Sequence, residues 1–210
     1  MARTVDHWEL GLSTWDPAWV EGYESILSIG NGRIGQRANF EEAYSGGSLQ
    51  GSYLAGVYYP DKTKVGWWKN GYPEYFAKVL NSTNWIGIDV KVDGEPLDLA
   101  KAQSVDQFVW GLNMQDGILK RSFSCTMQNG AAIQVVAERF CSMHNPELGC
   151  LRYRVEAGGH LVEVMPYLDA GVTNADSNWN DAFWSIHEVT HQGPGKACVR
   201  AETNKTHFGA

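Results

Sequence analysis

The sequence has no long apolar run and no extended run of basic residues. No segment approaches the roughly 20 apolar residues of a membrane-spanning helix, and the amino terminus has no apolar core of signal-peptide length. The formal net charge is -7, and a nucleic-acid partner is disfavoured because clustered lysine and arginine are needed to bind a phosphate backbone. We therefore expect a cytoplasmic protein whose partners include neither a membrane nor a nucleic acid.

Cysteine is scarce, and its spacing matches no common metal or redox motif. The 4 cysteines form no C-x-x-C pair, and all but Cys150 lie inside strand-like runs: Cys125, Cys141, Cys150 and Cys198. In a cytoplasmic protein, cysteines of this kind are expected to be free thiols rather than disulfides or metal ligands. The sequence predicts no cofactor and no metal site.

Aromatic residues are abundant by contrast. The chain has 9 Trp and 9 Tyr, whose flat faces can stack on sugar rings but are also ordinary core material. Hydrophobic residues make up 43% of the chain, enough to bury one substantial core. We expect residues 1–210 to form one domain.

Turn signals and alternating residues predict antiparallel strands throughout. Residues 86–93 alternate between apolar and polar side chains, and residues 151–156 repeat the pattern, which is typical of strands with one buried face. Asn or Asp followed by Gly supplies the positive φ values of tight hairpins at several points, among them Asn31-Gly32, Asp93-Gly94, Asp116-Gly117 and Asn129-Gly130. This pattern indicates an all-β fold, a two-sheet antiparallel β-sandwich or a barrel.

The carboxyl-terminal half predicts a meander. Residues 118–127 and 131–143 flank the turn at Asn129-Gly130, so we expect them to pair. Residues 150–156 are expected to pair next with residues 160–168, across Gly158-Gly159.

One helix and two long loops are predicted between the strands. Residues 73–80 are the best helical candidate, because Pro73 stands in the first turn. Residues 44–72 and 169–183 are rich in Gly, aromatic residues, Asn and Asp without a clear period, and we expect them to be ordered loops. Loops carry function more often than strands, which draws attention to the aromatic run 66–72.

Residues 30–35 match the G-x-G-x-x-G pattern of dinucleotide-binding folds. That pattern needs a helix directly after it, and residues 36–42 have no helical apolar stripe. A type I′ hairpin turn at Asn31-Gly32 accounts for the glycines, and we interpret the match in that way.

Residues 187–191 match H-E-x-x-H, which binds zinc when it lies on a helix. Val189 and Thr190 are β-branched, and a Gly-Pro-Gly breaker follows them, so the segment is predicted to be a strand. The two histidine Cα atoms would then be about 13 Å apart, at about 3.3 Å per residue, which is too far to share a metal.

Glu41 and Glu42 are a pair of adjacent carboxylates. In a strand their side chains would point to opposite faces. We therefore expect neither an acid/base pair nor a metal site at these residues.

Several strings resemble the amino-terminal domain of glycoside hydrolase family 65. The resemblance covers about residues 8–200 and is most specific within 24–88. Within the family it is closest to members that phosphorolyse maltose. The strings that carry it are ESILSIGNG (24–32), NFEEAYSG (39–46), GSYLAGVYYPDKT (51–63) and VGWWKNGYP (65–73), with weaker matches at 94–100, 117–123 and 139–142.

The resemblance implies a large two-sheet antiparallel β-sandwich of the galactose-mutarotase-like type, lacking its last strands if the domain extends beyond Ala210. In the family this domain precedes an α/α barrel that holds the active site, and the parent enzyme is typically a homodimer. The implied reaction is inverting phosphorolysis of an α-glucosidic disaccharide, with inorganic phosphate as co-substrate and no cofactor. The general acid belongs to the barrel, so the resemblance places no catalytic residue in this chain.

Two roles remain open for the aromatic run. Its residues could help to wall the substrate cleft of the parent enzyme or pack at a domain or dimer interface. The candidate residues are Trp67, Trp68, Lys69, Asn70 and Tyr72.

Two alternatives remain for the chain as a whole. It is a free-standing carbohydrate-binding sandwich that binds sugar through the aromatic run, or it comes from a trehalose, kojibiose or nigerose phosphorylase or a family 65 hydrolase.

Overall fold

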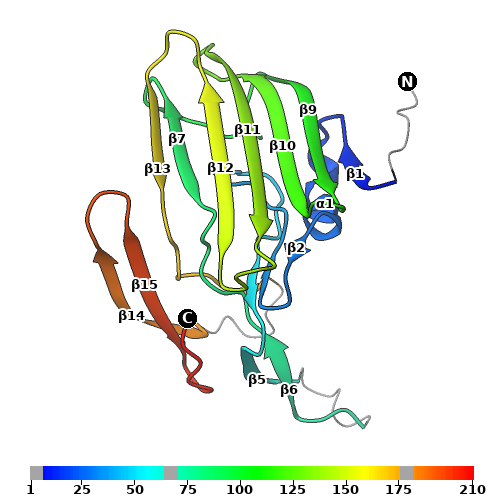
Figure 1. Cartoon of the computed structure of the whole chain (residues 1–210), viewed down its shortest axis with the longest axis vertical. Coiled ribbons are helices and arrows are strands. Elements are labelled where there is room, and N and C mark those ends of the chain that lie inside the picture. Colours follow the sequence, from blue (N-terminus) through cyan, green and yellow to red (C-terminus); the bar gives the residue numbers. More distant parts are fainter. Residues whose placement is uncertain (1–6, 64–70, 176–181) are drawn as a thin grey trace. The chain divides into compact units, whose positions relative to one another are not determined.

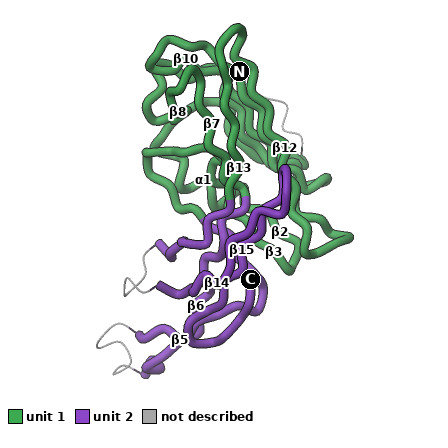
Figure 2. Tube along the Cα trace, turned by 90° about the vertical axis from the view of Figure 1, so that its left-hand side faces the viewer, with its two compact units in different colours: residues 1–50, 86–167 green, residues 51–85, 168–210 purple. Residues whose placement is uncertain are grey.

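The computed structural model describes residues 7–63, 71–175 and 182–210. The chain forms two compact units, residues 1–50 with 86–167 and residues 51–85 with 168–210 (Figure 2). Within the described ranges, no helix has the length and apolar character needed to span a membrane.

A five-stranded antiparallel sheet is the largest element of unit 1. Figure 1 shows its long strands side by side, in the order β1-β9-β10-β11-β12. The pairing predicted across Asn129-Gly130 is confirmed, with Phe123 opposite Val135. The strands are β1 (Glu9–Leu12), β9 (Ser104–Asn113), β10 (Ile118–Thr126), β11 (Ala132–Cys141) and β12 (Gly149–Glu156).

A second sheet has three strands in the order β13-β7-β8. They are β7 (Ile88–Val92), β8 (Glu95–Pro96) and β13 (Val162–Pro166). The predicted pairing of 150–156 with 160–168 is wrong, because β12 pairs with β11 and β13 pairs with β7. After β12 the chain therefore changes sheet.

Asp93 connects the end of β7 to the residues that precede β13. Its carboxylate accepts a hydrogen bond of 2.9 Å from the Leu161 N–H and lies 2.6 Å from Nδ1 of His160. Both partners immediately precede β13, so these contacts hold the start of β13 beside the end of β7.

The core of unit 1 lies between the two sheets, and the predicted all-β sandwich is confirmed. Inward-facing Val90 of β7, Phe123 of β10 and Val135 of β11 belong to one buried cluster. Burying each such side chain stabilises the fold by about 1.5–3 kcal/mol. Val20, in a short helical segment, and Leu27, directly after that segment, belong to the same cluster. That segment comprises η1 (Pro17–Trp19) and α1 (Val20–Ile26), and the short hairpin of β2 (Ile29–Gly30) and β3 (Ile34–Gln36) follows it.

The glycine turns differ in detail from the prediction. Asp93 and Gly94 have φ values of 51° and 81°, the two positive values that a type I′ turn requires. At the β2–β3 hairpin only Gly32 has positive φ, 85°, and the Asn31 side chain instead accepts hydrogen bonds from the N–H groups of Arg33 and Ile34. The expected hairpin is present there, but the type I′ geometry is wrong, because an Asx turn replaces it.

Unit 2 contains two antiparallel strand pairs, β5 with β6 and β14 with β15. Tyr59, Leu80, Phe183 and Trp184 form the main part of its buried cluster. Its strands are β4 (Ser52–Leu54), β5 (Tyr58–Lys62), β6 (Tyr75–Val79), β14 (Trp184–His191) and β15 (Ala197–Thr203).

The helix predicted at 73–80 is wrong, because β6 occupies that segment. Its pairing with β5 outweighs the local helical signal, and Lys78 makes a 2.5 Å ion pair with Asp61, which is only 2% exposed. The loop predicted at 44–72 is also partly wrong, because it contains β4 and β5. In the described part of 169–183 there is no strand, as expected.

Candidate functional site

The aromatic run lies mostly outside the described residues. Trp67, Trp68, Lys69 and Asn70 fall in that undescribed part, and the structure places only Tyr72, whose side chain is 61% exposed. The run lies in sequence between β5 and β6, where the Thr63 hydroxyl donates a 2.6 Å hydrogen bond to the Pro73 carbonyl.

The H-E-x-x-H segment is a strand, as predicted, since His187–His191 lies within β14. Glu202 of β15 is 2.6 Å from Nδ1 of His207 and 4.0 Å from Nε2 of His187. The hydrogen bond from His207 lowers the pKa of the Glu202 carboxyl. Across the ranges that the structure describes, no three His, Cys, Asp or Glu side chains are arranged to hold a metal ion.

A buried network of two arginines and two glutamates crosses the interior of unit 1. Arg121 of β10 donates to both carboxylate oxygens of Glu42, at 2.6 and 2.5 Å, and to Glu41 at 2.6 Å. Arg139 of β11 lies 3.0 Å from the other Glu41 oxygen. All four residues are at most 4% exposed.

The network joins strands β10, β11 and β12 to the segment 37–42. Arg139 donates hydrogen bonds to the carbonyls of Arg37 and Asn39, at 3.1 and 2.8 Å. Tyr153 of β12 donates a 3.1 Å hydrogen bond to Glu42. The Arg121 guanidinium also lies 4.3 Å from the centre of the Phe40 ring, within the range of a cation–π contact.

The opposite charges of this network favour the ionised forms of Glu41 and Arg121. Burial would raise the pKa of the Glu41 carboxyl, but Arg139 and Arg121 outweigh burial and lower it. Burial likewise opposes charge on Arg121, yet Glu42 and Glu41 raise the pKa of its guanidinium. The pKa of Tyr153 is well above its usual value because of burial and the nearby Glu42 charge.

This arrangement suits holding the segment 37–42 in position rather than acid/base chemistry. Both carboxylates are enclosed and already accept hydrogen bonds or ion pairs, so neither is available to a substrate. The expectation that Glu41 and Glu42 point to opposite faces is wrong, because their segment is not a strand and both side chains reach Arg121. The network therefore fixes segment 37–42 against the inner face of the large sheet.

Sequence reasoning missed the two arginines, although a signal was present. On β10, Leu119, Arg121, Phe123 and Cys125 occupy alternate positions and all are buried. An arginine at the apolar phase of an alternating strand points toward the core, where it requires a buried anionic partner.

Glu24 of α1 is a second enclosed carboxylate, with 0% exposure. It accepts hydrogen bonds of 2.6 Å from the Ser48 hydroxyl and from the Leu49 N–H. Burial raises the pKa of Glu24 despite these bonds. Glu24 thus fixes the segment that continues from the arginine-bound loop.

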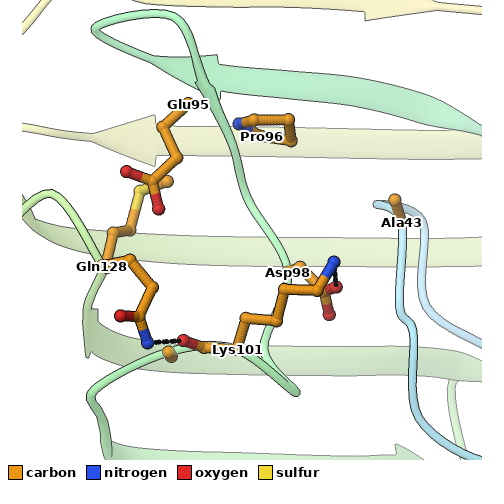
Figure 3. Close-up of a pocket in the computed structure, with 8 residues that line it drawn as sticks. Ala43, Glu95, Pro96, Asp98, Lys101 and Gln128 are labelled. Carbon is orange, nitrogen blue, oxygen red and sulfur yellow. Dashed lines mark hydrogen bonds and ion pairs between the residues drawn. The ribbon is translucent and has the colours of Figure 1, made fainter.

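A small cavity opens at one end of the sandwich in unit 1 (Figure 3). Its volume is about 190 Å³. The turns before β9 and after β10 form most of its walls. The lining residues are Ala43, Glu95, Pro96, Asp98, Lys101, Ala102, Met127 and Gln128.

Comparisons with known proteins identify relatives across almost the whole chain. A family model described as glycosyl hydrolase family 65, N-terminal domain, matches residues 11–210. A maltose phosphorylase of Bacillus subtilis is 45% identical over 207 residues, which are 98% of this chain and 27% of that protein. A kojibiose phosphorylase of Thermoanaerobacter brockii is 28% identical over 201 residues, 94% of this chain and 24% of that protein.

The fold agrees with these sequence matches. A solved structure named "Putative kojibiose phosphorylase from human microbiome" aligns with a TM-score of 0.80 at 25% identity, covering 95% of this chain and 26% of that one. The chain thus spans about a quarter of the length of these relatives.

Proposed function

The chain belongs to the N-terminal domain family of glycosyl hydrolase family 65, and on this premise we propose that it is a non-catalytic structural and assembly domain of a disaccharide phosphorylase. The proposed reaction converts maltose and inorganic phosphate to β-glucose 1-phosphate and glucose. The observation that carries it is 45% identity to a maltose phosphorylase over 98% of the chain.

The proposed chemistry places the reacting groups outside this chain. In inverting phosphorolysis one carboxylic acid protonates the leaving oxygen while phosphate attacks the anomeric carbon from the opposite face. A second carboxylate is not needed, because phosphate is itself the nucleophile. Consistent with this division, the enclosed carboxylates Glu24, Glu41 and Glu42 are all occupied by structural contacts.

The proposed partners are an α/α barrel in the same polypeptide and a second copy of the parent enzyme, in the cytoplasm. We assign the run Trp67, Trp68, Lys69, Asn70 and Tyr72 to a domain or dimer interface, because aromatic residues are enriched at interfaces. Replacement of Trp68 by Ala in the longer protein should shift its mass in solution from dimer toward monomer, or change KM for the disaccharide. If the mass in solution, KM and kcat are all unchanged, the run belongs neither to an interface nor to the substrate cleft.

A substrate panel tests the proposed reaction. The longer protein is incubated with maltose, trehalose, kojibiose and nigerose, each with and without phosphate, and the anomeric configuration of glucose 1-phosphate is read by proton NMR. Phosphate-dependent release of the β anomer from maltose is the expected result. Glucose release that does not depend on phosphate would identify a hydrolase, and preference for another disaccharide would reassign the substrate.

A further inference from the structure

The cavity of unit 1 is held open by hydrogen bonds between its walls. Gln128 donates to the Lys101 carbonyl, and Gln103 donates a 3.0 Å bond to the Gln128 carbonyl. Asn129 ties the same turn to β7 through a 3.0 Å bond to the Val92 carbonyl. The cavity is therefore preformed, as small-molecule sites usually are.

The cavity combines an apolar floor with a polar rim. Met127, only 3% exposed, lines the cavity together with Ala102 and Pro96, and Figure 3 shows Pro96 beside Glu95. The Glu95 carboxylate makes no hydrogen bond or ion pair with any residue in the described ranges. It therefore has acceptor capacity for a ligand.

Asp98 and Lys101 form the opposite part of the rim. Asp98 already accepts hydrogen bonds of 3.1 Å from the N–H groups of Ser45 and Ala100, and it lies 3.1 Å from the Lys101 ammonium. Burial would raise the pKa of Asp98, but these bonds outweigh burial and lower it. The acceptors of Asp98 are therefore used by contacts within the cavity wall, whereas the Lys101 ammonium still has N–H donors available for a ligand.

These features favour a neutral polyhydroxylated ring over an anionic ligand. A sugar presents C–H groups to an apolar floor and hydroxyl groups that both donate and accept, matching Glu95 and Lys101. Glu95 leaves one uncompensated negative charge once Asp98 and Lys101 are paired, which disfavours a phosphate ester. The cavity volume of about 190 Å³ is small, which suits one ring rather than two.

We propose that this cavity binds a single pyranose ring of a neutral hexose, at a site separate from the chemistry assigned to the parent enzyme. The site acts as a monosaccharide-binding pocket of the β-sandwich itself. A hexose has about 12 non-hydrogen atoms, so a dissociation constant on the order of 1 mM is expected.

Methionine methyl NMR tests this proposal on the 210-residue chain. The chain has 5 methionines, and among those in the described ranges Met127 alone lines the cavity. With ¹³C-methyl methionine, D-glucose should produce a saturable shift of the Met127 signal, assigned with Met127→Leu, while the Met143 signal stays unchanged. Glucose 1-phosphate and ethanolamine serve as the anionic and cationic probes and should bind at least tenfold more weakly.

Variants separate binding from general effects of sugar on the protein. Glu95→Gln should weaken glucose binding about tenfold, because a hydrogen bond to a charged acceptor is lost. Glu163→Gln, on β13, is the matched control and should leave binding unchanged, because the exposed Glu163 is not among the residues that line the cavity. Neither carboxylate makes a hydrogen bond or ion pair with a described residue, so thermal unfolding should be the same for both variants.

Three results would overturn the proposal. One is the absence of a Met127 shift at about 100 mM glucose, roughly a hundred times the expected dissociation constant. Another is tighter binding of ethanolamine or glucose 1-phosphate than of glucose. The third is an equal loss of binding in Glu95→Gln and Glu163→Gln. All three readouts are independent of phosphorolysis, so they can fail or succeed whether or not the longer protein phosphorolyses maltose.

Discussion

Replacement of Arg121 by Met should strongly destabilise unit 1. Methionine replaces the aliphatic part of the arginine side chain, but the change removes the cation that pairs with Glu41 and Glu42. Removing one partner of a buried ion pair generally costs about 3–5 kcal/mol, because the remaining charge is left without a partner. Arg139 still faces Glu41, so the unpaired charge is mainly that of Glu42. We therefore expect a loss of about 3 kcal/mol at pH 7, a large part of a typical domain stability of about 5–15 kcal/mol.

The pH dependence of this variant follows from the carboxylates. The Glu41 pKa is lowered in the folded protein, so its contribution is present above the unfolded value of about 4.3 and is lost as pH falls through the folded value. Arg121 is one of the two cations that lower the Glu41 pKa, so Arg121→Met removes part of this contribution. The difference in unfolding free energy between the wild-type chain and the variant should therefore narrow as pH falls below about 4.3.

Urea unfolding followed by near-UV circular dichroism measures both effects. Arg152→Met is the matched control, since Arg152 of β12 also pairs with a glutamate, Glu138, but its side chain is 80% exposed. Its loss should be no more than about 1 kcal/mol. If Arg121→Met unfolds the chain outright, the double variant with Glu42→Met, which removes both charges, should regain most of the stability. A loss in Arg121→Met equal to that in Arg152→Met would refute the reasoning.

Three further outcomes are expected. Because the Glu24 pKa is raised in the folded state, wild-type stability should fall relative to Glu24→Gln as pH rises above the unfolded value of about 4.3, and urea midpoints across pH 4–7 should show this. Gly94→Ala should cost about 1 kcal/mol, since Gly94 has φ 81°, whereas Gly159→Ala, with open space and no positive φ, should be neutral in thermal unfolding. Iodoacetamide at pH 8, read by peptide mass mapping, should label Cys150 and spare Cys125, whose pKa burial and the Glu42 charge raise to about 12; equal labelling would contradict the described burial.

Local pattern in the sequence predicted much of the fold but not its sheet assignments. Alternation and the Asn129-Gly130 turn were enough to predict β10 and β11, because adjacent strands joined by a tight turn pair with each other. The pairing of β13 with β7 joins residues about 70 positions apart and depends on the shared core rather than on a turn. The helix predicted at 73–80 failed for a similar reason, since pairing with β5 outweighs the local preference for a helix.

The buried network shows a different limit of sequence reasoning. Glu41 and Glu42 were interpreted as strand residues, and in a strand adjacent side chains do diverge. The structure places them in an irregular segment, where both reach the same guanidinium. The cavity was not predictable either, since its floor and rim come from turns separated by about 30 residues that carry no shared motif.

Phosphate-dependent glucose release from maltose, measured in parallel on this 210-residue chain and on the longer protein that contains it, tests the central claim most directly. The account predicts activity in the longer protein and none in the 210-residue chain, because the general acid and the phosphate site are assigned to the α/α barrel. Activity in the short chain would place a catalytic site among these residues and contradict the assignment of a structural role.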